Sequence, residues 1–388
     1  MRILFGSWPG YGHLLPMVPL IRAAQHGGHE VVVSSGADMS ALIGRLGVAV
    51  HRSGVTRAES YDRMPGQATI SELPADQQPG FAARHLFGAG AVDRAHDLLD
   101  LLQRWRPDLI VHDTLELGSP TAAALHGIPH VTHGYGPMVP NTSYFAAAIA
   151  AAISDAGLPD PTPAIFAAPY LDICPPGLRG TEPNPWTTIH PLRPSPGEIE
   201  PHAAAELDLS ALPHPDTVYL TLGTIMNQTP RVFRAVIDGC VRWPVNLVVT
   251  TGPGFDSALL GPLPPAVRTA PFLPQAAVLP HCRAVVSHAG AGTMLGALCY
   301  GLPQLCLPQG TDQPSNTTAL LPTGAALALH PDQITAAAVA EALGRLLNEP
   351  SFRQAATRLR AEIERMPTAA AVLHELLVTT DHSQTHSP

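Results

Sequence analysis

The chain has 388 residues, a formal net charge of -9 and 45% hydrophobic residues. This length favours two domains of about 180 residues each, and the negative charge without a basic cluster argues against a nucleic-acid partner. There is no apolar run near the ~20 residues that span a bilayer, no secretory signal and no disulfide framework among the five cysteines, so we expect a cytoplasmic protein without a membrane partner.

Short apolar strands alternate with helices in the first half of the chain, which is typical of a parallel sheet covered on both faces. The expected strands are residues 3–6, 31–34, 48–51, 109–112 and 129–132, and the expected helices are residues 14–25, 39–46, 81–104 and 119–126. Residues 53–80 are polar, contain Pro and Gly and have no steady period. We interpret them as a long mobile loop.

A proline-rich zone at residues 175–215 interrupts this alternation and is the candidate linker. A second series follows, with strands at residues 218–222, 246–250, 284–287 and 304–307 and helices at residues 230–241 and 294–300. The pattern predicts an α/β fold with domains at residues 1–195 and 216–365, a linker at 196–215, and a C-terminal helix and tail at 366–388. Apolar residues at helical spacing near residues 352–366 predict a helix that either packs on its own domain or crosses back to the first.

A glycine-rich turn opens a helix directly after the strand at residues 284–287. Free backbone N–H groups and about half a positive charge at such a helix start suit a phosphate or diphosphate. Gly290 and Gly292 keep the backbone bare enough for close approach. His288, at the end of the strand, either adds a donor to a phosphate oxygen or is a structural histidine bonded to a carbonyl.

Asp312 and Gln313 lie side by side on a loop after the strand at residues 304–307. Together they offer acceptors and donors for adjacent hydroxyl groups at the C-terminal edge of a strand. The alternative for Asp312 is an ordinary N-cap of the next helix.

His13 lies in the loop after the first strand, and Asp113 directly follows the strand at residues 109–112. An imidazole with an ordinary pKa near ~6.5 can take a proton from a hydroxyl group, and a carboxylate beside it would fix its tautomer. From the residues alone, His13 as a neighbour of a helix cap and Asp113 as a plain loop acid stay open. Strand alternation places His112 and Asp113 on opposite faces, so only one of them easily faces a site.

Taken together, these motifs resemble the nucleotide-sugar-dependent glycosyltransferases with two facing Rossmann-like domains, the GT-B fold. The resemblance is to the bacterial branch that acts on polyketide and macrolide natural products. It spans nearly the whole chain, and the matching segments are residues 12–16, 221–224, 272–275, 288–293, 301–303 and 312–313. The resemblance implies that the chemistry lies in a cleft between the two sheets.

The resemblance also implies roles for individual residues. It makes His13 the general base and Asp113 its partner. It assigns the donor nucleotide sugar to Gly223, Thr224, Phe272, Leu273, Gln275, His288, Gly290, Ala291, Gly292, Thr293, Asp312 and Gln313. The residues expected to contact the acceptor are Trp8, Tyr11, His112 and Tyr135.

The implied reaction is the inverting transfer of a deoxysugar from a dTDP-sugar to a hydrophobic aglycone. Because no DxD-type acidic pair stands in a suitable place, we expect the helix start and His288 to stabilise the leaving diphosphate without a metal or another cofactor. Gly296 stands where plant relatives carry a glutamate for the ribose hydroxyls, which favours dTDP over UDP. Phe272 replaces the usual base-stacking tryptophan, which weakens stacking, unless Phe272 belongs to the core.

Three other functions occur on folds of this kind. A nicotinamide-dependent oxidoreductase would need a third glycine near the position of Pro16. A nucleotide-sugar epimerase, or a silent auxiliary that only binds the aglycone, remains an alternative on the same fold. The aglycone, the deoxysugar and the oligomeric state, including a homodimer, stay open.

Overall fold

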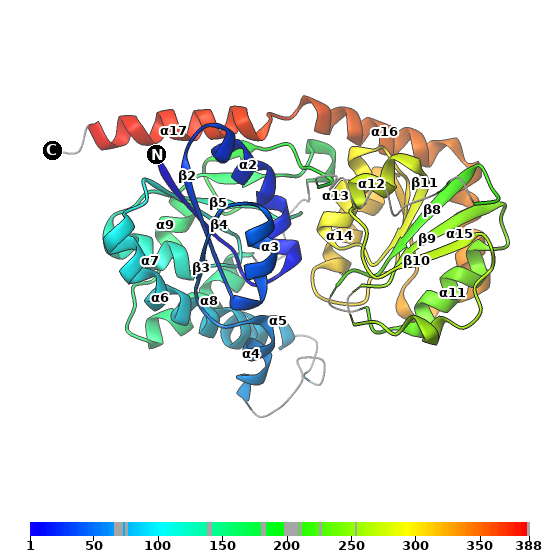
Figure 1. The fold of residues 1–388 in the computed structure, drawn as a ribbon, viewed down its shortest axis with the longest axis horizontal. Coiled ribbons are helices and arrows are strands. Elements are labelled where there is room, and N and C mark those ends of the chain that lie inside the picture. Colours follow the sequence, from blue (N-terminus) through cyan, green and yellow to red (C-terminus); the bar gives the residue numbers. More distant parts are fainter. Residues whose placement is uncertain are drawn as a thin grey trace. The chain divides into compact units, whose positions relative to one another are not determined.

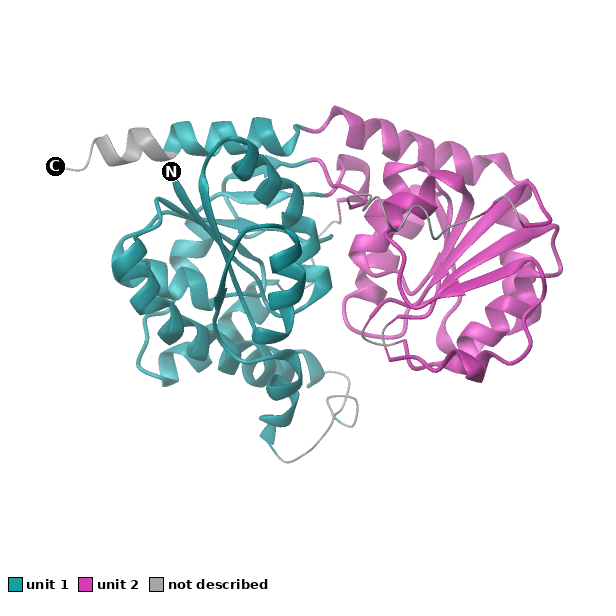
Figure 2. Ribbon diagram, in the orientation of Figure 1, with its two compact units in different colours: residues 1–173, 181–192, 367–388 teal, residues 174–180, 193–366 magenta. Residues whose placement is uncertain are grey.

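The computed structural model divides the chain into two compact units, coloured separately in Figure 2. Unit 1 comprises residues 1–173, 181–192 and 367–388, and unit 2 comprises residues 174–180 and 193–366. The structure describes all residues except 66–72, 74–76, 138–141, 180–183, 198–208, 210–211, 225–226, 253 and 386–388, and the side chains of 380–385. Most of the linker expected at residues 196–215 lies outside the described residues. The expected first domain, residues 1–195, included residues 174–180, which belong to unit 2.

Unit 1 is built on a sheet of seven strands in the order β3-β2-β1-β4-β5-β6-β7. All neighbouring strands are parallel. Their bounds are β1 Arg2–Gly6, β2 Glu30–Ser35, β3 Ala49–Arg52, β4 Leu109–Asp113, β5 His130–His133, β6 Tyr170–Asp172 and β7 Ile189–Pro191. The first five match the expected strands within two residues at each end. β7 lies in the proline-rich zone at residues 175–215, where no strand was expected.

Helices cover both faces of this sheet (Figure 1). They are α1 Tyr11–Leu14, α2 Val18–His26, α3 Ser40–Arg45, α4 Arg57–Asp62, α5 Gln78–Phe81, α6 Ala89–Trp105, α7 Gly118–His126, α8 Thr142–Asp155, α9 Thr162–Ala167 and α17 Ala369–Thr385, with a π-helical segment at Ala82–Gly88. The expected loop at residues 53–80 was wrong in part, because α4 forms within it. Thr56 and Glu59 build a capping box that fixes the start of α4, while residues 66–72 and 74–76 lie outside the description.

Unit 2 is built on six parallel strands in the order β10-β9-β8-β11-β12-β13. The strands are β8 Asp216–Thr221, β9 Val245–Thr250, β10 Val267–Ala270, β11 Cys282–Ser287, β12 Gln304–Cys306 and β13 Ala326–Ala328. The helices are α11 Pro230–Cys240, α12 Gln275–Val278, α13 Ala291–Cys299, α14 Gln313–Leu320, α15 Ala336–Asn348 and α16 Pro350–Arg365. The predicted α/β class with two parallel-sheet domains is therefore confirmed.

Alternate residues of the central strands of unit 2 enter two different cores. Val218 and Leu220 of β8 belong to a cluster with Phe233 of α11 and Leu343 of α15. Tyr219, between them, belongs to a second cluster with Val278 and Leu302. Because successive strand side chains point to opposite faces, a sheet buried on both sides needs an unbroken apolar run, and this is what β8 has.

The C-terminal segment contains both of the expected helices, near residues 352–366 and within residues 366–388. α16 ends at Arg365 in unit 2, and α17 packs against α2 in unit 1. His190 and Glu375 add an ion pair of 3.2 Å within unit 1. The helix expected near residues 352–366 is therefore α16, which belongs to its own unit, and the C-terminal helix that follows it, α17, belongs to unit 1.

The order of strands in each sheet reverses at one place. In unit 1, β2 and β3 lie on one side of β1, and β4 lies on its other side. In unit 2, β9 and β10 lie on one side of β8, and β11 lies on its other side. In doubly wound sheets, ligands bind outside the carboxyl ends of the strands at this switch point. Within the described ranges no helix is long and apolar enough to cross a bilayer, and no cluster of three or more His, Cys, Asp or Glu could hold a metal ion.

Candidate active site

The loop after β1 brings His13 to the switch point of unit 1. The strand ends at Gly6, where a β-carbon would collide with the side chain of Ser119 and lie 2.6 Å from Glu116 Oε2. The chain then passes through Ser7–Gly10 and enters α1, whose third residue is His13. The absence of a side chain at Gly6 therefore lets the end of β1 pass close to α7.

His13 and Asp113 meet across the switch between β1 and β4. His13 Nδ1 lies 3.1 Å from Asp113 Oδ1, and the side chains are 14% and 1% exposed. Because an ionised carboxylate can only accept, Nδ1 carries the proton and donates it to Asp113. The lone pair of neutral His13 is then on Nε2, which is the arrangement that a general base requires.

Asp113 is held by two further donors. The backbone N–H of Trp8 donates to Oδ2 at 2.6 Å and that of Leu115 donates to Oδ1 at 2.9 Å. Burial acts to raise the pKa of Asp113, but the charge and hydrogen bond of His13 and the two N–H donors outweigh it and hold the pKa below its ordinary value. Asp113 is thus ionised at neutral pH.

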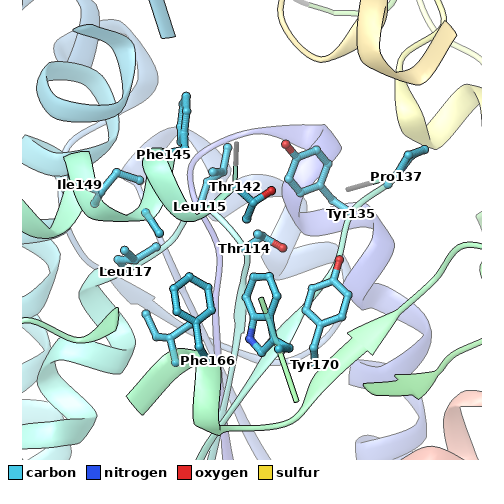
Figure 3. A pocket seen from close by; sticks show the side chains of 14 residues that line it. Thr114, Leu115, Leu117, Tyr135, Pro137, Thr142, Phe145, Ile149, Phe166 and Tyr170 are labelled. Carbon is cyan, nitrogen blue, oxygen red and sulfur yellow. The ribbon is translucent and has the colours of Figure 1, made fainter. Parts of the chain in front are cut away.

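An apolar pocket opens beside this pair in unit 1 (Figure 3). Its cavity volume in this conformation is about 20 Å³, room for about one water molecule. Tyr135, which lines it, places its ring 5.0 Å from the ring of His13, and Leu115, whose N–H holds Asp113, lines it as well. Figure 3 shows Phe145 and Phe166 among the other lining side chains. A hydrophobic molecule in this pocket would therefore adjoin the His13 ring.

The residues expected at the acceptor have different environments. Trp8 is buried, and the centroid of its ring lies 5.1 Å from the ring centroids of both His13 and Phe87. Tyr11 is 37% exposed. His112 does not fit the expectation: it is fully buried, Nδ1 donates to the Asp113 carbonyl at 3.0 Å, and Nε2 lies 3.2 Å from Thr132 Oγ1. Both of its ring nitrogens are already engaged, so it has no atom to offer an acceptor.

The glycine-rich turn of unit 2 presents the start of α13 at the second switch point. Ala289 has φ +62°, a conformation unusual for a residue with a side chain. Ser287 Oγ accepts its N–H at 3.1 Å, and Asn316 Nδ2 donates to its carbonyl at 3.0 Å. Gly290 is the N-cap and has no side chain to cap the helix. The first N–H groups of α13 therefore have no partner within the helix.

His288 packs between the two glycine turns of this site. A β-carbon on Gly223, which has φ +77°, would lie 2.6 Å from His288 Nε2, and one on Gly290 would collide with the same atom. Nδ1 of His288 is buried and has no hydrogen-bond partner among the described residues. Burial lowers the pKa of His288, although Asp312 and the Thr221 carbonyl oppose this. Glycine at positions 223 and 290 thus makes the space that His288 occupies.

The other residues expected to bind the donor differ in exposure and in contacts. Phe272 is 58% exposed, so the alternative that it belongs to the core is wrong. Leu273 is 6% exposed and packs with Tyr219, which leaves only its backbone for a nucleotide. Gln275 Nε2 donates to Thr293 Oγ1 at 2.7 Å. Thr224 follows Gly223 in the turn after β8 and is partly buried.

Asp312 and Gln313 do not form the free hydroxyl-binding pair that was expected. Gln313 Oε1 accepts from the backbone N–H of Gln309 at 2.7 Å and of Gly310 at 3.2 Å, and its Nε2 donates to Thr311 at 3.2 Å. Gln313 therefore holds its own loop together. Asp312 is at the N-cap position of α14 without a capping side-chain bond, and it accepts from Asn316 at 2.7 Å.

Comparisons with known proteins agree with this geometry. Sequence models of the erythromycin biosynthesis protein CIII-like N-terminal and C-terminal domains match residues 22–162 and 234–378. The L-demethylnoviosyl transferase of Streptomyces niveus is 31% identical over 97% of both chains. The chain belongs to this glycosyltransferase family. Among solved structures, the glycosyltransferase SnogD of Streptomyces nogalater has a TM-score of 0.76 and 28% identity, covering 98% of this chain and 99% of its own.

A second solved relative carries a nucleotide. The glycosyltransferase SsfS6 of Streptomyces sp. SF2575, complexed with thymidine diphosphate, has a TM-score of 0.77 and 25% identity. The match covers 97% of the present glycosyltransferase and 99% of SsfS6. The family assignment thus covers both units of the chain, including the two switch points.

His133 is a residue of this glycosyltransferase that sequence reasoning missed. It ends β5 in register with Asp113, is fully buried, and donates from Nδ1 to the Gly134 carbonyl at 2.6 Å. Its Nε2, and Nδ1 of His130 at the other end of β5, are buried without a hydrogen-bond partner among the described residues. A signal was available, because His133 closes the strand after the one that Asp113 closes. Both strand ends then meet at one edge of the sheet.

These buried histidines predict a loss of stability in acid. Burial lowers the pKa of His130 to about 3 and that of His133 to about 4. The unfolded chain, with histidine pKa values near ~6.5, binds more protons than the native state between these limits. The contribution of these histidines to the free energy of unfolding is therefore fully present above pH ~6.5. As the pH falls below ~6.5, the free energy of unfolding decreases by about 1.4 kcal/mol per pH unit for each such histidine.

Urea unfolding between pH 7 and pH 4.5 measures this slope. We expect the His133→Gln variant to lose about 1.4 kcal/mol per unit of the slope. The control, His126→Gln at an exposed position, should keep the slope of the wild type. A His133→Gln slope equal to that of the wild type would contradict this account of the buried histidine.

Proposed function

We propose that this glycosyltransferase moves a deoxysugar from a dTDP-sugar to a hydrophobic aglycone of polyketide or macrolide type, with inversion at the anomeric carbon. The hydrogen bond between His13 and Asp113, beside an apolar pocket, is the observation that carries the proposal. The relative named L-demethylnoviosyl transferase and the thymidine diphosphate complex of SsfS6 support the class of sugar and nucleotide.

His13 acts as the general base. Its Nε2 takes the proton of the acceptor hydroxyl while that oxygen bonds to the anomeric carbon from the face opposite the leaving group. The bond from this carbon to the diphosphate oxygen breaks, and its electron pair leaves with dTDP. Asp113 stabilises the imidazolium that forms, and the configuration at the anomeric carbon inverts.

Unit 2 stabilises the negative charge that grows on the diphosphate. The N–H groups of Gly292 and Thr293 at the start of α13, and the ring of His288, are fixed donors of the kind that contributes most to such reactions. Because these donors take the charge, we propose that the enzyme needs neither a metal ion nor another cofactor. The dTDP-sugar is its co-substrate.

The lining of the pocket of unit 1 suits an apolar acceptor, and a large acceptor requires the pocket to open further. Its lining includes Phe145, Phe166 and Trp186, with Thr114 and Tyr135 as polar members. Such a surface gains from burying apolar area, and the few polar groups restrict how a flat or macrocyclic molecule is oriented. The proximity of the Tyr135 and His13 rings, at 5.0 Å, puts the base at the margin of the pocket.

The position of Gly296 predicts a preference for dTDP over UDP. A β-carbon at this position would lie 2.9 Å from Gln275 Oε1, so no longer side chain fits there without moving Gln275. A carboxylate that binds ribose hydroxyls contributes about 1.5–3 kcal/mol, and this chain has none at residue 296. We expect dTDP to inhibit transfer more strongly than UDP in competition assays. Clearly tighter inhibition by UDP would refute the nucleotide assignment.

The proposed function is tested by mass spectrometry of products from a panel of dTDP-sugars and polyketide or macrolide aglycones, in parallel reactions with and without EDTA. We expect a mass increase of one deoxysugar and dTDP release that depends on the acceptor. An epimerase would convert the donor without net dTDP release, and a silent binder would release none. Loss of turnover on addition of EDTA would contradict the metal-independent assignment.

A further inference from the structure

A hydrogen bond joins the first residue of α12 to the third residue of α13. Gln275 Nε2 donates to Thr293 Oγ1 over 2.7 Å. Thr293 is 7% exposed, and its backbone N–H is one of those that the helix leaves without an internal acceptor. The contact therefore orders a hydroxyl group directly at the amide-lined start of α13.

The surroundings of Gln275 fix the position of its amide. Gly296 lies one turn after Thr293 on α13, and a β-carbon there would lie 2.9 Å from Gln275 Oε1 and 3.4 Å from Leu279 Cδ1. The side chain of Gln275 also interacts with the hydroxyl of Tyr219, which is itself buried and lies 2.7 Å from Thr250 Oγ1. Gly296 thus provides the space in which the amide reaches Thr293.

The direction of this hydrogen bond has a chemical consequence. A threonine hydroxyl has one proton and two lone pairs. When Oγ1 accepts from Gln275, its own proton is available to a different acceptor. The carbonyls of the preceding turn each already accept one hydrogen bond, Ala289 O from Asn316 and Gly290 O from the N–H of Met294, so an anionic oxygen is the stronger acceptor for this proton. An anionic oxygen at the start of α13 would receive that proton.

We propose that Gln275 is a positioning residue that turns the Thr293 hydroxyl into a donor for the diphosphate of the sugar nucleotide. This inference rests on the proposed function. In this role Gln275 acts through Thr293. His288, whose Nε2 lies against the β-carbon position of Gly290, adds a second polar group beside the start of α13.

Two replacements of Gln275 separate positioning from a structural role. Gln275→Met keeps the length of the side chain but removes the donor. Gln275→Glu keeps the shape but, when ionised, accepts the proton of Thr293 and turns the hydroxyl away from the anion. Because hydrogen bonds to charged groups are the strong ones, we expect dTDP affinity to fall about tenfold in Gln275→Met and further in Gln275→Glu at pH 7.5.

The loss in Gln275→Glu should be relieved by acid. A protonated glutamate donates as the amide does, and its ordinary pKa is near ~4.3. We expect calorimetry to show the affinity of Gln275→Glu for dTDP recovering, relative to the wild type, as the pH falls from 7.5 to 5. The matched control is Gln333→Glu, at an exposed capping position where the two residues are interchangeable, and it should bind as the wild type does at both pH values.

A double-mutant cycle with Thr293→Val completes the test. We expect Gln275→Met to cause no further loss of dTDP affinity once the Thr293 hydroxyl is gone, and Thr293→Ser to retain affinity. Losses that multiply in the double variant, or a Gln275→Glu defect independent of pH, would overturn the inference while leaving dTDP binding intact. If the wild type fails to bind dTDP, the proposed function fails and the inference fails with it.

Discussion

Replacing His13 by alanine should lower the rate of sugar transfer by about 10²- to 10⁴-fold, the usual contribution of a positioned general base. The variant removes the nitrogen that takes the acceptor proton, and leaves every donor-binding group of unit 2 in place. We therefore expect kcat to fall while the affinity for dTDP, measured by calorimetry, stays that of the wild type. His126→Ala, in the exposed last turn of α7, is the matched control and should transfer normally.

Asp113→Asn tests the same base through its tautomer. The amide of asparagine can donate to Nδ1 of His13, which would place the ring proton on Nε2 and remove the lone pair that faces the acceptor. We expect a rate loss similar to that of His13→Ala, and little further loss when both changes are combined. If the rate losses of the two single variants multiplied in the double variant, Asp113 would not act through His13.

Gly223→Ala should weaken dTDP binding by about one to two orders of magnitude, the equivalent of one hydrogen bond to a charged group. A β-carbon at residue 223 would lie 2.6 Å from His288 Nε2, so the ring must leave its place between the two turns. Gly254→Ala is the matched control. Gly254 is in the same unit with φ +74°, against φ +77° at Gly223, but nothing lies within 4 Å of its β-carbon position.

Both glycine variants carry the strain of a side chain at positive φ, which costs on the order of 1 kcal/mol. Thermal unfolding should therefore show destabilisation of both variants, larger in Gly223→Ala because its β-carbon also displaces the His288 ring, and calorimetry should show weakened dTDP binding in Gly223→Ala alone. In a His288→Ala background, Gly223→Ala should cause no further loss of affinity. Equal binding losses in the two glycine variants would mean that backbone strain, and not His288, explains the effect.

The sequence predicts the two halves of this site because each is a local pattern. A short apolar strand, a turn with glycine and a helix start are adjacent in the chain, both before His13 and before Thr293. The order of strands in a sheet is not a local property of the sequence. The pairing of His13 with Asp113, 100 residues apart, is therefore predicted only by the resemblance to a family. The residues alone left both of them open to structural roles.

Where prediction failed, side chains had partners that no spacing reveals. Gln313 is used by the backbone of its own loop, and His112 by a carbonyl and Thr132, so neither is free for a substrate. The three-residue strands β6 and β13 are too short to show a period. α4 was predictable in principle, because Thr56 and Glu59 have the spacing of a capping box.

The most direct test is a crystal structure of the enzyme with dTDP and an aglycone acceptor. We predict the β-phosphate within hydrogen-bond distance, about 2.7–3.2 Å, of the N–H groups of Gly292 and Thr293, and the acceptor hydroxyl within the same range of His13 Nε2. A diphosphate bound elsewhere in unit 2, or an acceptor hydroxyl held away from His13, would contradict the account.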